Sequence, residues 1–75
     1  MIYIRLKELA KEKGFSQGKL SRASDVDDNT IKRIYRNPYV TVTTETLSKL
    51  AKALGVSIHD LLVEVPDDQA EGDHR

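Results

Sequence analysis

A run of polar and charged side chains between Asp28 and Asn37 offers the chemistry in this sequence that is best suited to recognising a ligand. Ile31 and Ile34 interrupt the run, and their spacing places both on one side of a helix. The side chains left on the other sides are Asp28, Asn29, Thr30, Lys32, Arg33 and Arg36. Asparagine can pair with adenine, arginine can pair with guanine, and aspartate can accept a hydrogen bond from cytosine. The pattern therefore predicts a helix face that can read the edges of DNA bases.

Three polar residues near the predicted helix ends are suited to phosphate groups. Arg36 and Asn37 lie at the end of the helix just described, and Gln17 begins an earlier one. The side chain and the free backbone N–H of Gln17 can both donate to a phosphate oxygen. Asp28 has two roles open to it, because it can read cytosine or can simply complement the helix dipole in the first turn. The cationic side chains alone would also fit an ordinary solvated helix face, so the interpretation depends on the elements that carry them.

Two short helices joined by a tight turn are predicted to carry these side chains. Ser16 and Asp27 can each accept a free backbone N–H at a helix start. These caps predict helices over residues 17–24 and 28–36, with the turn over residues 25–27. The apolar residues expected to hold the pair together are Leu20, Ala23, Val26, Ile31 and Ile34. Such a pair is a helix-turn-helix motif, which places its second helix in the major groove while the first lies across the phosphate backbone.

Further helices are predicted on both sides of the motif, which spans residues 17–36. Their predicted positions are residues 5–13, residues 44–54 and a short helix from residue 58. Gly14 and Gly55 can close the two longer helices in the left-handed conformation. Ser57 and Asp60 have the spacing of a capping box at the start of the short helix. Alternating apolar residues near the ends predict a pair of short strands over residues 2–5 and 62–65.

The charges divide unevenly along a chain whose formal net charge is zero. Eleven Lys and Arg residues stand against eight Asp and Glu residues before residue 66, which leaves that part near +3. Four acidic residues and one arginine leave residues 66–75 near −3. We therefore expect one mildly basic domain over residues 1–65. An acidic tail over residues 66–75 is expected to be disordered, because it has almost no apolar side chains with which to build a core.

Several classes of protein are disfavoured by what the sequence lacks. Cysteine is absent and histidine occurs only twice, so we expect neither disulfides nor a metal site. No apolar run approaches the roughly 20 residues of a membrane span, and the start does not have the pattern of a signal peptide, so a cytoplasmic protein is expected. No nucleophile with a base and no glycine-rich phosphate loop is evident, so we expect no enzyme and no cofactor.

Four runs of residues resemble a known family. They are Phe15-Ser16-Gln17-x-x-Leu20-Ser21, Asn29-Thr30-Ile31-x-Arg33-Ile34, Thr46-Leu47-x-x-Leu50-Ala51-x-Ala53-Leu54-Gly55-Val56-Ser57 and Asp60-Leu61-Leu62. Their order is similar to that of the Cro/repressor-type, or Xre-like, helix-turn-helix family, and the resemblance covers roughly residues 6–62. It implies an all-α, five-helix, lambda-repressor-like domain, to which the short terminal strands would be added. Asp25 departs from the usual glycine of the turn, and Ser24 departs from a usually apolar position.

The resemblance also implies a function, which is sequence-specific binding to double-stranded DNA and regulation of transcription. Repression by homodimers bound to inverted repeats is the expected mode. By position, the resemblance places Gln17, Asp28, Asn29, Thr30 and Arg33 at the DNA. An alternative is an antitoxin-like module that binds a partner protein and its own operator, with the acidic tail folding on the partner. The sequence leaves open the operator, activation against repression, and whether dimers form through the short fifth helix or the terminal strands.

Overall fold

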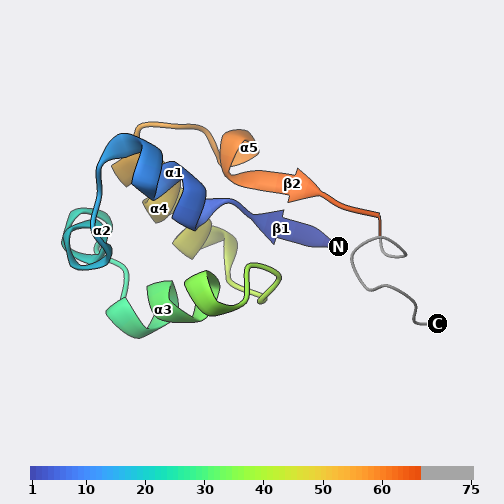
Figure 1. Ribbon diagram of the computed structural model, residues 1–75, viewed down its shortest axis with the longest axis horizontal. Helices are drawn as coiled ribbons and strands as arrows, with labels where there is room; N and C mark the ends of the chain where they lie inside the picture. The colour runs from blue at the N-terminus through green and yellow to red at the C-terminus, as the bar shows by residue number, and fades with distance from the viewer. Residues whose placement is uncertain (67–75) are drawn as a thin grey trace.

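The structure is a computed structural model and describes residues 1–66. Within that range the elements are β1 (Ile2–Ile4), α1 (Leu6–Lys13), α2 (Gln17–Ser24), α3 (Asp28–Arg36), α4 (Thr44–Leu54), α5 (Ile58–Leu61) and β2 (Leu62–Glu64). Figure 1 shows α2 and α3 on one side of the molecule, with the terminal strands extending from the other. The predicted five-helix class with short terminal strands is confirmed. The predicted disordered tail lies outside the described residues except for Pro66.

Local capping groups set the starts of four helices. Ser16, Asp27 and Thr43 each accept a hydrogen bond from a backbone N–H in the first turn of α2, α3 and α4 respectively. The short helix α5 begins with a reciprocal capping box between Ser57 and Asp60. Each cap satisfies a backbone donor that would otherwise have no partner within its helix. Because these signals are local, the predicted starts of the four helices agree with the observed ones.

One apolar core is shared by all five helices. Its largest fully buried side chains are Leu6, Leu20, Ile31, Ile34, Leu50 and Leu61. Helix α4 lies at the centre, because it packs against α1, α2 and α5. Full burial of one such side chain stabilises the fold by about 1.5–3 kcal/mol relative to exposure. The core therefore fixes α2 and α3 on a rigid support.

The terminal sheet is tied to the loop that follows α3. β1 pairs with β2 in antiparallel fashion, with Ile4 opposite Leu62. The backbone N–H of Ile4 donates to the carbonyl of Pro38 at 2.9 Å. The rings of Tyr3 and Tyr39 meet edge to face, with their centroids 5.4 Å apart. Contacts from the sheet therefore hold the chain directly after the C-terminal end of α3.

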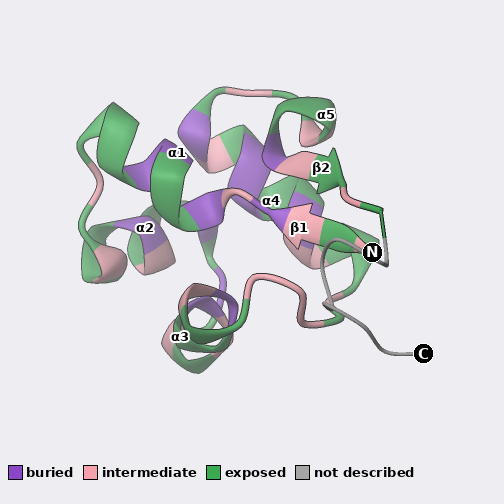
Figure 2. Ribbon diagram, turned by 45° about the vertical axis from the view of Figure 1, so that its right-hand side comes forward, coloured by how far each residue is buried: buried purple, intermediate pink, exposed green. Residues whose placement is uncertain are grey.

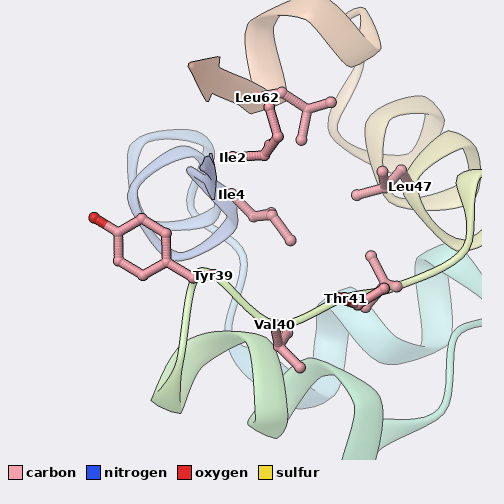
Figure 3. Close-up of a pocket in the computed structure, with 8 residues that line it drawn as sticks. Ile2, Ile4, Tyr39, Val40, Thr41, Leu47 and Leu62 are labelled. Atoms are coloured by element: carbon pink, nitrogen blue, oxygen red, sulfur yellow. The ribbon is translucent and has the colours of Figure 1, made fainter. Parts of the chain in front are cut away.

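An apolar pocket of about 300 Å³ lies between the sheet, this loop and α4 (Figure 3). It is lined by Ile2, Ile4, Tyr39, Val40, Thr41, Val42, Leu47 and Leu62. Figure 3 shows the side chains of Ile4 and Leu47 directed toward the space from opposite sides. The lining has few polar groups, so the pocket offers no cluster of side chains for acid–base or nucleophilic chemistry.

Helix α2 corrects one prediction about the core. Ala23, which was expected to face inward, is exposed, whereas Ser24 is buried with 5% of its surface exposed. The hydroxyl of Ser24 donates to the carbonyl of Leu20 at 2.7 Å. A buried hydroxyl with such a partner does not carry the cost of an unsatisfied polar group. The inward side of α2 therefore runs through Leu20 and Ser24.

Candidate nucleic-acid interface

The turn between α2 and α3 holds these helices by hydrogen bonds and by packing. Asp25 adopts the left-handed conformation with φ of 60°, and its N–H donates to the carbonyl of Ser21 at 3.0 Å. The hydroxyl of Ser21 donates to the carbonyl of Val26 at 2.7 Å, and the Val26 side chain is buried. Aspartate tolerates the left-handed region better than most residues. The turn can therefore form without the glycine that often occupies this position.

Helix α3 turns one side into the core and leaves the other accessible. Ile31 and Ile34 retain only 0% and 1% of their exposed surface. Asp28, Asn29, Thr30, Lys32, Arg33 and Arg36, which we call the outer face of α3, are exposed or half-buried. Figure 2 shows α3 at the lower edge of the molecule, with its buried positions turned toward the other helices. The division between the buried and accessible sides of α3 is the one that the sequence predicts.

A short polar network joins the starts of α2 and α3. The side-chain nitrogen Nε2 of Gln17 donates to Oδ1 of Asp28 at 3.2 Å. The other carboxylate oxygen of Asp28 lies 3.8 Å from Nζ of Lys32. Gln17 and Asp28 were predicted separately as DNA contacts, but the bond between them was not. The network orients the Gln17 amide and offsets the negative charge of Asp28, which would otherwise repel phosphates.

Asn37 lies just beyond α3, and its side chain holds the first turn of the loop that follows. Its Oδ1 accepts a hydrogen bond from the backbone N–H of Tyr39 at 3.2 Å. Among residues 1–66, no partner bonds to the side-chain nitrogen of Asn37, so this amide can donate to a phosphate. Arg36, directly before it, is exposed. The two predicted phosphate contacts at this end of the helix are therefore accessible together.

The positive charge of the outer face is concentrated at Arg33 and Arg36. Within the described part of the chain, neither arginine forms an ion pair, whereas Lys32 lies close to Asp28. Lys19 and Arg22 on α2 add two further exposed cations. Arginine presents a planar set of donors that matches guanine or phosphate in paired hydrogen bonds. The arrangement is therefore suited to an anionic partner with base edges to read.

Comparison with known proteins decides the family. The model of the Cro/C1-type HTH DNA-binding domain matches residues 5–67, which is most of the chain. The chain belongs to this family. The Xre-like resemblance stated from the sequence is confirmed, and the matched residues include the helix-turn-helix formed by α2 and α3.

Two curated relatives of this Cro/C1-type chain are HTH-type transcriptional regulators. The SinR proteins of Bacillus licheniformis and Bacillus subtilis (strain 168) are each 33% identical to it over 72 residues. The aligned region covers 96% of this chain and 65% of each relative. The chain thus spans about two thirds of the length of these regulators, and the match includes the whole helix-turn-helix.

Tyr35 is the aromatic residue on α3 of this Cro/C1-type domain, and it has a structural role. Its side chain is half-buried and packs against the core. Burial raises the pKa of Tyr35 above the ordinary tyrosine value, because the charged phenolate is poorly solvated there. The phenol therefore stays neutral at physiological pH.

The described residues of this Cro/C1-type domain contain neither a membrane-spanning helix nor a metal-ligand cluster. No helix between residues 1 and 66 has both the length and the apolar content needed to cross a membrane. Over the same range, no three side chains of the metal-ligating types come together.

Proposed function

We propose that residues 1–65 form a domain that binds double-stranded DNA in a sequence-specific manner and regulates transcription. The observation that carries the proposal is the outer face of α3, a polar and cationic surface directly opposite the buried Ile31 and Ile34. In a helix-turn-helix this face enters the major groove, while α2 lies across the phosphate backbone. The outer face displays the donor and acceptor groups that distinguish base pairs in that groove.

Within this proposal, base reading is assigned to Asn29, Thr30 and Arg33 in the first two turns of α3. Asn29 is suited to the paired donor and acceptor of adenine, and Arg33 is suited to the paired acceptors of guanine. Thr30 is half-buried at the side of the face, where its hydroxyl and methyl group can contact a neighbouring base. Asp28 is occupied by Gln17 and Lys32. We therefore assign Asp28 to holding those side chains in place rather than to reading cytosine.

Phosphate contacts are assigned to the residues at the two ends of the motif. Gln17 stands at the N-terminal end of α2, where free backbone N–H groups add to its side chain. Lys32, Arg36 and Asn37 lie on α3 or just past its end, at positions open to solvent. These contacts would fix the orientation of the domain without reading sequence. In this proposal the phosphate contacts position the domain on DNA, and the base contacts give it sequence specificity.

The complete regulator is proposed to be a homodimer on an inverted repeat. One module of this kind buries only about 600–1,000 Å² of protein surface on DNA, so a second half-site would raise affinity greatly. Two α3 helices would then enter successive major grooves about 34 Å apart. The two candidate dimer interfaces are the short helix α5 and the terminal sheet. Exposed apolar side chains favour the sheet, where Ile2 and Val63 are 42% and 38% exposed.

Regulation is proposed to be repression, since a dimer that occupies a promoter can block transcription without a further contact. The relatives are bacterial regulators by name, and a protein of this kind would act in the cytoplasm, where bacterial DNA lies. The antitoxin-like alternative is not favoured by the family or by these relatives.

Selection from a randomised duplex pool tests the proposal. The purified protein is used to enrich duplexes, the winners are sequenced, and the affinity for the best sequence is titrated with salt. We expect an inverted repeat, with a log–log salt slope of about −0.9 for each phosphate contacted. A folded protein that enriches no sequence even at low salt would overturn the proposal and favour the alternative, a module that binds a partner protein.

A further inference from the structure

The two arginines of the outer face lack acidic partners in the described part of the protein. Arg33 and Arg36 are exposed, and none of the ion pairs formed among residues 1–66 includes them. Lys32 on α3 and Lys49 on α4 differ from these arginines, since Lys32 lies near Asp28 and Lys49 lies near Glu45. The C-terminal half of α3 is therefore a site of uncompensated positive charge.

The sequence supplies the complementary charge directly after the described residues. Asp67, Asp68, Glu71 and Asp73 follow Pro66, and Arg75 is the only Lys or Arg residue in that stretch. A run in which carboxylates outnumber cations in this way resembles the phosphate backbone in charge. The patch formed by Arg33 and Arg36 and the segment of residues 67–75 therefore have opposite charge.

The terminal sheet connects Pro66, the last described residue, to the C-terminal end of α3 by a short path. Leu62 is paired with Ile4, and the N–H of Ile4 is bonded to the carbonyl of Pro38. The path from Pro66 to Arg36 runs back along β2 to Leu62, across the sheet to Ile4, through the hydrogen bond to Pro38 and then along the chain. At about 3.3 Å per extended residue, this path places Pro66 at most about 30 Å from the backbone of Arg36. An extended chain from residue 67 to residue 73 spans about 25 Å, and the length of an arginine side chain closes the rest.

We propose that the acidic segment of residues 67–75 binds back onto the C-terminal end of α3 and competes with DNA for Arg33 and Arg36. Glu71 and Asp73 are the carboxylates with the reach to make this contact. The contact itself depends only on the charges and the fold, whereas the competition rests on the proposed DNA-binding function. Each exposed ion pair is weak, but the covalent tether gives the segment an effective concentration in the millimolar range.

Such a contact would sharpen discrimination between DNA sequences. Non-specific DNA relies almost entirely on phosphate contacts, so a tethered acidic segment competes with it effectively. A specific site adds base contacts, which the segment cannot imitate, and so displaces it. The acidic segment would thus lower binding to random DNA more than it lowers binding to the operator.

The contact is tested first without DNA, by NMR of the arginine side-chain Nε–H groups in the full chain. The variant E71Q/D73N removes the two carboxylates with the required reach. Its matched control, E12Q/E45Q, changes the net charge equally by neutralising exposed acids on α1 and α4. We expect E71Q/D73N to shift the signals of Arg33 and Arg36, and added salt to produce the same shift in the unmodified chain. The signal of Arg5, which is bonded to the carbonyl of Asp60, should stay in place.

The competition is tested by the affinity of the same proteins for a random duplex at low salt. We expect E71Q/D73N to bind about 3- to 10-fold more tightly than the unmodified chain, with a smaller gain for E12Q/E45Q. Equal gains for the two variants would mean that net charge alone is responsible and would overturn the proposal. Unchanged Arg33 and Arg36 signals would overturn it as well. A protein that binds no DNA at all would refute the proposed function, while the NMR comparison would still decide whether the contact exists.

Discussion

Helices α3 and α4 are built by the same local rules but differ in what they present to solvent. Each begins with a side-chain cap, turns an apolar side inward and carries one acid–lysine pair one turn apart. Helix α4 buries four residues and packs against α1, α2 and α5. Helix α3 buries two, lies at the edge of the molecule and leaves Arg33 and Arg36 without acidic partners among residues 1–66. The comparison separates a helix that supports the fold from one that displays a surface.

The largest effect that would sharpen this comparison is expected in the core of α4. Leu50→Ala removes a side chain with 0% exposure at the centre of the domain. We expect the free energy of unfolding to fall by about 2–5 kcal/mol, because the substitution loses apolar burial and leaves a cavity. Urea unfolding followed by circular dichroism measures the loss. Lys52→Ala on the exposed side of α4 is the control and should change stability by less than about 0.5 kcal/mol. Equal effects would contradict the central position of α4.

The second largest effect is expected on the affinity for DNA rather than on the stability of the fold. Arg33→Ala should weaken binding to the selected duplex by about 1–3 kcal/mol and relax specificity at one base pair, because the guanidinium is assigned to a guanine. Its unfolding free energy should be unchanged, since the side chain is exposed. Lys49→Ala provides the matched cation on α4 and should leave specificity intact. Equal weakening of Arg33→Ala on every sequence would show that Arg33 contacts only phosphate.

A smaller effect should be shared by the two helices. Asp27→Ala and Thr43→Ala each remove the cap at the start of α3 and α4 respectively. We expect each to lower the free energy of unfolding by about 1 kcal/mol, because a backbone N–H loses its partner. Thermal unfolding of the two variants under the same conditions makes the comparison. A negligible loss for Asp27→Ala beside a normal loss for Thr43→Ala would mean that tertiary packing, rather than the cap, sets the start of α3.

The smallest effect is expected in the turn before α3. Asp25→Gly should stabilise the domain by about 0.5 kcal/mol, because glycine adopts the left-handed conformation of residue 25 without steric cost. Asp25→Ala should destabilise it, since alanine keeps the Cβ and loses the polar side chain that makes this conformation tolerable. Chemical denaturation of both variants tests the sign of each change. A gain in stability for alanine would contradict the account of the turn.

The sequence predicted the helix ends well because their causes are local. Ser16 and Asp27 act within one turn of their own positions, and the predicted bounds of α2 and α3 agree with the observed ones. The orientation of α2 was harder to predict, because few apolar residues mark its inward side. The predicted choice of Ala23 was wrong, since the buried position belongs to Ser24, whose hydroxyl is satisfied by its own helix.

Contacts between distant residues account for what the sequence did not predict. The bond from Gln17 to Asp28 joins two helices across the turn. The bond from Ile4 to Pro38 joins the terminal sheet to the loop after α3. No periodicity or capping rule specifies such pairs, because they depend on the angle at which packed elements meet. The outer face of α3 was predicted as a set, whereas the network that organises it required the structure.

The most direct test of the DNA-binding account is an NMR titration of the backbone amides with the selected duplex. We predict that the large shifts will fall on Gln17 and on residues 28–37, with small shifts on the exposed side of α4. Added salt should reverse the shifts at phosphate-contacting positions first, because those contacts are the most sensitive to ionic strength. Shifts concentrated on α4, α5 or the terminal sheet, with α3 unchanged, would contradict the assignment of α3 as the helix that reads DNA.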